Sequence, residues 1–175
     1  MQSPKSLVNS CLKKLRSSDS SQEAINILLQ SIERMVSDYA VAAEFVKAHG
    51  MDYVMDAIRK NQTTQSPVLI FNEVMGHEDL FSWEDKRIDV PFVEHVAENI
   101  ELERTKRGFS LDDKALNCTL GILETLVRTP SKYEMTQQAI SVPSFLNFLQ
   151  QDSQVVQWHA LALFNSMFKQ ADKDR

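Results

Sequence analysis

The 175-residue sequence has few of the residues that form tight turns and loops. It contains four glycines and five prolines, which is sparse for a protein rich in β-turns or in glycine-rich phosphate-binding loops. No segment alternates apolar and polar residues between turn signals, so no strand is expected. A mostly helical protein is therefore predicted.

Cysteines and long apolar runs are also scarce. The two cysteines, Cys11 and Cys118, lie far apart, and neither has a second ligand at metal-binding spacing. We expect both to be reduced core thiols in an intracellular protein. No apolar run reaches the roughly 18 residues that a membrane-spanning helix needs, and the N-terminus has no signal-peptide stretch. A cytoplasmic protein is predicted, with recruitment to the plasma membrane as an option.

An excess of charge of one sign is missing as well. The chain has 19 basic and 24 acidic residues, a formal net charge of −5, which is too little to indicate a nucleic-acid partner. Apolar residues make up 43% and charged residues 25%, as in an ordinary soluble globular protein. A chain of this length buries roughly 70% of its unfolded surface, so we expect a core that needs no metal, disulfide or cofactor.

Local signals predict where the first helices begin and end. Ser3 followed by Pro4 is typical of a helix start, and this helix is expected to end near Arg16. Ser20 with Glu23 three residues later forms a capping box for a second helix.

Asp38 is expected to cap a third helix, with Gly50 as the left-handed residue that ends it. Ser66 followed by Pro67 repeats the cap-plus-proline start. The charged segment 101–108 is expected to be a frayed helix end or a mobile loop, and Ser110 with Asp113 opens the next helix. Helices are thus predicted over 51–58, 66–75, 90–100, 110–128, 131–140, 142–150 and 153–169.

Similar helices recur along the chain. The short helices 51–58, 90–97 and 142–149 begin 39 and 52 positions apart, near the 40–47-residue period of armadillo and HEAT repeats, and 101–108 is interpreted as a loop insertion in the longer interval. Apolar residues of a later helix match those of the last helix 41 positions on: Leu120, Ile122, Leu123, Leu126 and Val127 match Leu161, Leu163, Phe164, Met167 and Phe168.

Stacked repeats exist because each unit covers the apolar face of its neighbour. The predicted fold is all-α, an armadillo/HEAT-like right-handed superhelix of stacked helices, and a non-repetitive helical bundle is the alternative. The chain is interpreted as one domain over 1–175. Within it, 1–37 would form N-terminal capping helices, and 38–76, 89–128 and 131–170 would be repeat units.

Four residues are candidates for contact with a protein partner. Glu73, Glu124 and Asn165 occupy equivalent points of three successive third helices, and on one concave surface they would offer acceptors to a basic or extended segment. Trp158 lies off the main apolar stripe of its helix and could be a binding hot spot, with core packing as the alternative.

The first predicted helix carries a basic face. Lys13, Lys14 and Arg16 could attract an anionic lipid surface or an acidic partner. An ordinary solvated surface is the alternative.

No residue pattern indicates catalysis. The histidines at 49, 77, 95 and 159 are dispersed, and none has a His or Cys three or four residues on. The carboxylate pairs at 84–85 and 112–113 lie at predicted helix starts, where negative charge favours the helix dipole. The motif Gly-x-Ser-x-Gly is absent, so no catalytic or metal-binding residue is predicted.

Four stretches of the sequence match a known pattern: AEFVKAHGM (43–51), EVMGH (73–77) followed by SWED (82–85), ALNCTLGILETLV (115–127), and the armadillo-like unit 141–168. Through them, the chain resembles the armadillo-like helical region of the ELMO (engulfment and cell motility) scaffold family over roughly residues 20–172.

The resemblance implies a non-enzymatic scaffold. Proteins of that family pair with DOCK-type exchange factors to activate the GTPase Rac in phagocytosis of dying cells and in cell migration. The armadillo-like region is associated with autoinhibitory contacts and with binding of Rho-family GTPases and engulfment receptors. Two alternatives remain, the armadillo-like GTPase-binding region of a diaphanous-type formin and a small helical enzyme.

Overall fold

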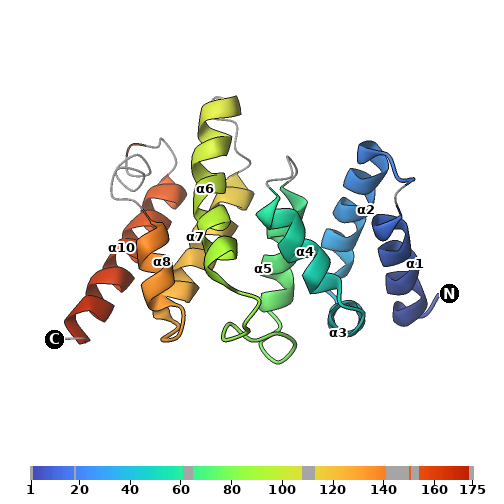
Figure 1. Cartoon of the computed structure of the whole chain (residues 1–175), viewed down its shortest axis with the longest axis horizontal. Helices are drawn as coiled ribbons and strands as arrows, with labels where there is room; N and C mark the ends of the chain where they lie inside the picture. The colour runs from blue at the N-terminus through green and yellow to red at the C-terminus, as the bar shows by residue number, and fades with distance from the viewer. Residues whose placement is uncertain are drawn as a thin grey trace. The chain divides into compact units, whose positions relative to one another are not determined.

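The computed structural model describes residues 2–17, 19–60, 65–107, 113–140, 150 and 154–173. All regular structure in these ranges is α-helical, without a strand, which confirms the predicted all-α fold (Figure 1). The chain divides into two compact units, Met1–Ser82 and Trp83–Arg175.

The N-terminal unit contains the helices α1 (Pro4–Arg16), α2 (Gln22–Met35), α3 (Tyr39–Lys47), α4 (Gly50–Arg59) and α5 (Ser66–Met75). Helix α1 packs against α2 and α3, α3 packs against α4, and α5 packs against both α2 and α4. The largest side chains buried between them are Leu12, Leu29, Phe45, Met51, Met55, Ile70 and Phe71.

Two of the predicted helix caps are confirmed. The Ser3 hydroxyl accepts a hydrogen bond from the backbone N–H of Ser6 at 3.2 Å, and α1 has the predicted bounds. The Asp38 carboxylate accepts one from the N–H of Val41 at 3.1 Å. Both side chains satisfy N–H groups that the first turn of a helix leaves without a partner.

The predicted capping box of α2 is wrong by one residue. Ser21 is the cap, and its hydroxyl accepts from the N–H of Ala24 at 3.2 Å. The Ser20 hydroxyl instead donates to the backbone carbonyl of Lys14 at 2.7 Å. Adjacent serines can cap equally well, so the contact with the end of α1 decided between them.

The predicted cap of α5 is also wrong. Ser66 lies inside the first turn, and Gln65 occupies the cap position without a side-chain hydrogen bond. The Ser66 hydroxyl donates to the Glu33 carboxylate on α2 at 3.3 Å, so this serine ties α5 to α2.

Gly50 has a different role from the predicted left-handed helix end. His49 adopts the left-handed conformation, with φ of 62°, and Gly50 is the first residue of α4. A Cβ added to Gly50 would lie 2.5 Å from the ring of Phe45. Glycine is therefore needed at 50 because α3 and α4 approach closely there, while His49 bears the steric cost of positive φ.

The C-terminal unit contains the helices α6 (Val90–Arg107), α7 (Asp113–Arg128), α8 (Tyr133–Ala139) and α10 (Gln154–Lys173). Helix α7 packs against α6, α8 and α10, and α6 also packs against α8. Its largest buried side chains are Ile88, Phe92, Leu120, Ile122 and Leu123. The predicted Ser110 start and residues 142–149 of the predicted helix 142–150 lie outside the described residues.

The expectation of a frayed end or loop over 101–108 is wrong, because α6 continues through Arg107. No glycine or proline occurs between Pro91 and Arg107. Residues 101–107 consist largely of Glu, Leu, Arg and Lys, which are strong helix formers. Residues 101–107 therefore lengthen α6.

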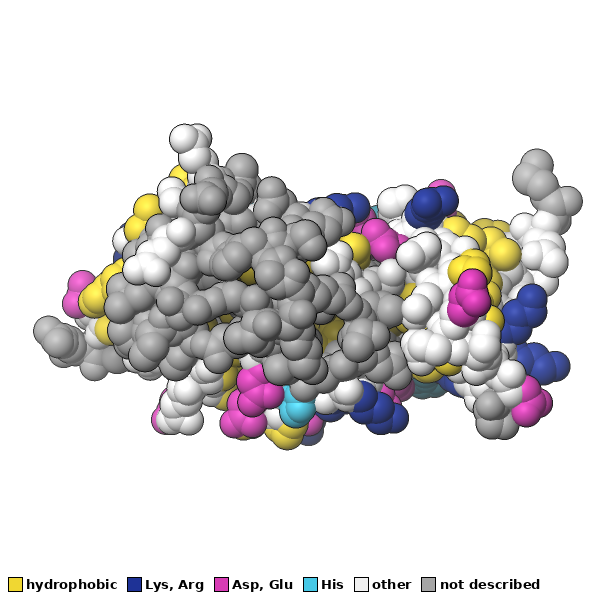
Figure 2. All heavy atoms as spheres, turned by 90° about the horizontal axis from the view of Figure 1, so that it is seen from above, with side chains coloured by type: hydrophobic (Ala, Val, Ile, Leu, Met, Phe, Trp, Pro, Cys, Tyr) yellow, Lys and Arg dark blue, Asp and Glu magenta, His cyan; other side chains and the backbone are white. Residues whose placement is uncertain are grey.

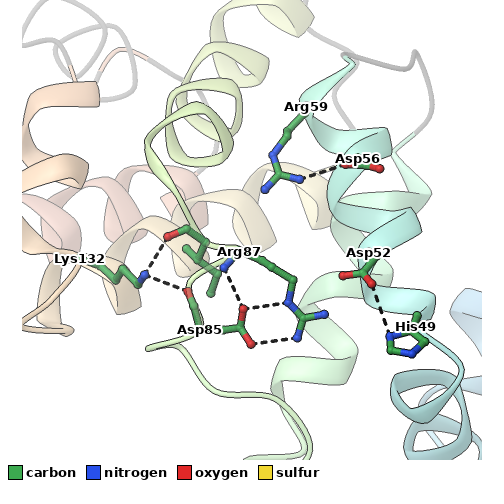
Figure 3. A network of polar contacts seen from close by, with 8 residues as sticks. His49, Asp52, Asp56, Arg59, Asp85, Arg87 and Lys132 are labelled. Carbon is green, nitrogen blue, oxygen red and sulfur yellow. Dashed lines mark hydrogen bonds and ion pairs between the residues drawn. The ribbon is translucent and has the colours of Figure 1, made fainter.

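A buried lysine anchors the segment that precedes α6 (Figure 3). Lys132 is 6% exposed, and its ammonium group donates to the backbone carbonyls of Asp85 at 2.9 Å and Ile88 at 2.8 Å. The Ser131 hydroxyl donates to the Glu84 carboxylate beside it. Burial of an ammonium group is tolerated here because carbonyl oxygens replace its water.

Glu84 and Asp85 do not cap a helix, contrary to the prediction. Asp89 caps α6, accepting from the N–H of Phe92 at 3.0 Å. Asp85 accepts from both the backbone N–H and the guanidinium of Arg87 at 2.9 Å. These hydrogen bonds lower the pKa of Asp85 below its ordinary value of 3.8, burial opposes them, and the charges of Arg87 and Lys132 add to the lowering.

Two glycine substitutions should change stability in opposite directions. Gly50→Ala should lower the free energy of unfolding by about 1–3 kcal/mol, because the new methyl group overlaps the Phe45 ring. The matched control Gly121→Ala in α7, whose Cβ would meet nothing within 4 Å, should raise it by about 0.5–1 kcal/mol. Urea unfolding followed by circular dichroism measures both, and equal effects would contradict the close approach at Gly50.

Asp85→Asn should reduce stability in a pH-dependent way. A depressed folded-state pKa contributes stability above the unfolded pKa of about 3.8, and this is lost as the pH falls through the folded value. The variant should be less stable at pH 7 by up to about 1 kcal/mol, because solvent partly screens the pair, and the difference should shrink below pH 4. Urea unfolding between pH 3 and 7, with Asp172→Asn on α10 as control, tests this. A pH-independent difference would refute it.

Candidate functional site

Exposed apolar side chains gather on α10. Of the seven large apolar residues exposed in the described part of the chain, four belong to this helix: Trp158 is 65% exposed, Leu161 53%, Phe164 39% and Phe168 59%. They recur at intervals of three or four residues, so they share one side of the helix. We call these four residues the outer face of α10.

An adjacent side of α10 is part of the core. Ala160 and Leu163 are buried, and α10 packs against α7. On the outer face, the rings of Phe164 and Phe168 contact each other edge to face, with centroids 4.7 Å apart. The outer face is therefore an ordered aromatic and aliphatic surface, and exposed apolar surfaces of this kind mark interaction sites.

Two of the predicted partner-binding residues lie on this side of α10. Trp158 is the most exposed residue of the outer face, so its indole is not part of the core. Asn165 is exposed and follows Leu161 by one helical turn. Trp158 and Asn165 therefore lie on the same side of α10.

The two predicted glutamates are placed differently. Glu124 is on α7, the helix that packs against α10; its side chain is largely buried and lies 3.8 Å from the guanidinium of Arg128. Glu73 is on α5 and is partly buried. The structure thus groups Glu124, Trp158 and Asn165 on packed helices of one unit, while Glu73 belongs to the other unit.

The predicted basic face of α1 is divided between two roles. Lys13 and Lys14 are exposed in the last turn of α1, and Figure 2 shows basic side chains at the edge of the molecule where α1 lies. Arg16 donates to the backbone carbonyls of Ala48 and His49 at 3.1 and 3.2 Å. Its guanidinium therefore satisfies the C-terminal end of α3.

The described residues do not form a metal centre or an activated thiol. Among the side chains described, no group of three or more His, Cys, Asp or Glu residues is placed to hold a metal ion. Burial raises the pKa of the Cys11 thiol above 9.0, with the charge of Lys14 opposing it, which disfavours the thiolate that a nucleophile needs. Among the described helices, none combines the length and apolar character required to cross a membrane.

Three outer-face residues, Leu161, Phe164 and Phe168, were missed as surface residues by sequence analysis. Phe164 and Phe168 were counted with the apolar positions of the last helix. A signal was available, because the apolar residues between 158 and 168 cover more of the helix circumference than one core-facing stripe needs.

Comparison with known proteins gives the family. The family described as ELMO, armadillo-like helical domain, matches residues 40–175. Over 169 residues the chain is 25% identical to engulfment and cell motility protein 2 of Mus musculus, 25% to that of Bos taurus and 24% to that of Homo sapiens. Each alignment covers 91% of this chain and 22% of the relative, so the chain spans about a fifth of these relatives' length. The match extends over most of the sequence and every helix from α4 onward, and the chain therefore belongs to the ELMO family through its armadillo-like helical domain.

Proposed function

We propose that this chain is a non-catalytic protein-interaction module of an ELMO-type scaffold. The observation that carries the proposal is the outer face of α10, where four large apolar side chains are exposed to solvent on a helix that buries Ala160 and Leu163. Family membership supports the same conclusion.

The scaffold would act with a DOCK-type exchange factor to promote Rac activation and actin remodelling. Phagocytosis of apoptotic cells and cell migration would be the processes served, in the cytoplasm and at the plasma membrane. The names of the engulfment and cell motility relatives support this role. Because the chain spans about a fifth of those relatives, we assign it the regulatory contacts, with a Rho-family GTPase or an engulfment receptor as the direct partner.

The repeat organisation is part of the proposal. Residues 1–37 would cap the stack, and the units 38–76, 89–128 and 131–170 would each cover the next. Helices α3 to α5 fall within the first range and α6 and α7 within the second; the third contains α8 and all of α10 except its last three residues. The packing of both α8 and α10 on α7 supports the contact between the second and third units.

The partner would contact the chain through Glu124, Asn165 and Trp158, with Glu73 at the equivalent position of the first unit. Asn165 offers both a donor and an acceptor, and Trp158 offers a large apolar surface. Lys13 and Lys14 remain available to an acidic partner or an anionic membrane surface.

The double variant Glu124→Lys, Asn165→Lys should weaken binding of a Rho-family GTPase about tenfold or more, because it places two positive charges where the partner would be basic. Calorimetric titration of the chain with Rho-family GTPases, in GTP-bound and GDP-bound forms, measures the change. The control Glu134→Lys, Gln137→Lys makes the same charge change at exposed positions of α8.

The single variant Asn165→Lys, at an exposed position, should keep the thermal unfolding of the unsubstituted chain. The double variant also loses the ion pair between Glu124 and Arg128, so it should stay folded but unfold at a slightly lower temperature. Unfolding of the variant would show that Glu124 and Asn165 are structural. Equal weakening by the α8 control, or no binding of any GTPase by the unsubstituted chain, would contradict the proposed contact.

A further inference from the structure

The same apolar pattern is buried on one helix and exposed on another. Leu120, Leu123 and Val127 of α7 are all buried. Shifted by 41 positions, they correspond to Leu161, Phe164 and Phe168 of α10, which are all exposed.

The two helices differ in how many helices pack against them. Helix α7 is packed by α6, α8 and α10, whereas among the described helices α10 packs mainly against α7. Helix α10 brings a narrow stripe to this contact, made of the buried Ala160 and Leu163 and the partly buried Met167. On α10, the equivalent residues form the outer face, which the described residues leave exposed.

We propose that the outer face of α10 is the docking site for one amphipathic helix of a partner protein. The partner helix carries a small residue followed by aliphatic residues at i+3 and i+7, the spacing with which α10 itself presents Ala160, Leu163 and Met167. The inference rests on the proposed function of the chain as a protein-interaction module, and it names the chemistry of the partner.

The size of the outer face favours a single helix over a second copy of the chain. From the exposed fractions, its four side chains offer about 400–500 Å² in total, taking ~200 Å² for each fully exposed large apolar side chain. A stable dimer needs about 800 Å² on each partner. A single amphipathic helix docks through a few apolar anchors at i, i+3, i+4 and i+7, so it does not need the area of a stable dimer interface.

Asn165 gives the face a polar group within the apolar surface. It is exposed one turn after Leu161 and one turn before Lys169. A hydrogen bond from its amide to a polar residue of the partner helix would fix the register, because a shifted helix would leave the amide unpaired against apolar atoms.

A peptide derived from α10 provides the probe. It has the sequence of residues 154–173 with Trp158→Gln, Leu161→Gln, Phe164→Gln and Phe168→Gln, so it loses the outer face and keeps the stripe of Ala160, Leu163 and Met167. It contains no tryptophan, so the fluorescence of Trp158 in the 175-residue chain with Trp83→Phe, which leaves a single tryptophan, reports its binding. A second peptide that also has Leu163→Lys is the matched control.

The expected result is saturable 1:1 binding with a blue shift of tryptophan emission. Binding should weaken at least tenfold with the control peptide and with the chain variant Leu161→Lys, Phe168→Lys. It should persist with Ile27→Lys, which changes an exposed apolar residue on α2. The substituted side chains are exposed, so circular dichroism should give unchanged unfolding of all chain variants.

Several outcomes would overturn the proposal. The first is that the peptide does not bind; the second is that binding survives in the chain variant Leu161→Lys, Phe168→Lys, which would mean that the peptide replaces α10 on α7. The third is that the unsubstituted chain self-associates and the chain variant does not. The fourth is that the unsubstituted chain adsorbs to phosphatidylserine–phosphatidylcholine vesicles and the chain variant does not. GTPase titration of the same variant separates the two proposals. If the peptide does not bind but the GTPase does, the docking site for an amphipathic helix is rejected and the proposed function stands. If the peptide binds but no GTPase does, only the assignment of a Rho-family GTPase as the partner is rejected.

Discussion

The structure depends on one constraint: each helix has an apolar side that another helix must cover. Helix α7 illustrates it, because three other helices of its unit, α6, α8 and α10, pack against it, and its apolar residues are buried over a wide arc. In the N-terminal unit, α5 has the same position between α2 and α4. Hydrogen bonds adjust the ends of the helices, but burial of apolar surface decides which helices pack together.

Sequence patterns predicted the helical fold well because helical periodicity and capping chemistry are local. Ser3 and Asp38 cap the helices for which they were predicted. The failures occurred where a tertiary contact decided the outcome. Ser20 donates a hydrogen bond to the end of α1, and Ser66 donates one to Glu33 of α2. Gly50 is required because the ring of Phe45 leaves no room for a Cβ atom.

The candidate surface was predictable only in part. Trp158 was singled out because it lies off the apolar stripe, and the structure leaves it exposed. Leu161, Phe164 and Phe168 looked like core residues, because a sequence pattern shows that a helix face is apolar and does not show whether another helix covers it. Arg16, in turn, looked like a surface charge, yet it is bonded to the backbone at the end of α3.

Membership of the ELMO family agrees with the resemblance that the sequence motifs indicated, and it selects that family over the formin alternative. The buried Lys132 lies beside Glu84 and Asp85, a combination that could suggest catalysis. Its ammonium group is occupied by two backbone carbonyls, so it serves to hold the segment before α6.

The central claim is that the outer face of α10 is open in the isolated chain. Acrylamide quenching of Trp158 fluorescence tests this most directly, with Trp83→Phe introduced so that a single tryptophan is observed. The account predicts quenching close to that of a free indole, in line with the 65% exposure of Trp158. Strong protection of the indole would mean that the chain covers its own α10 face, and it would contradict the account.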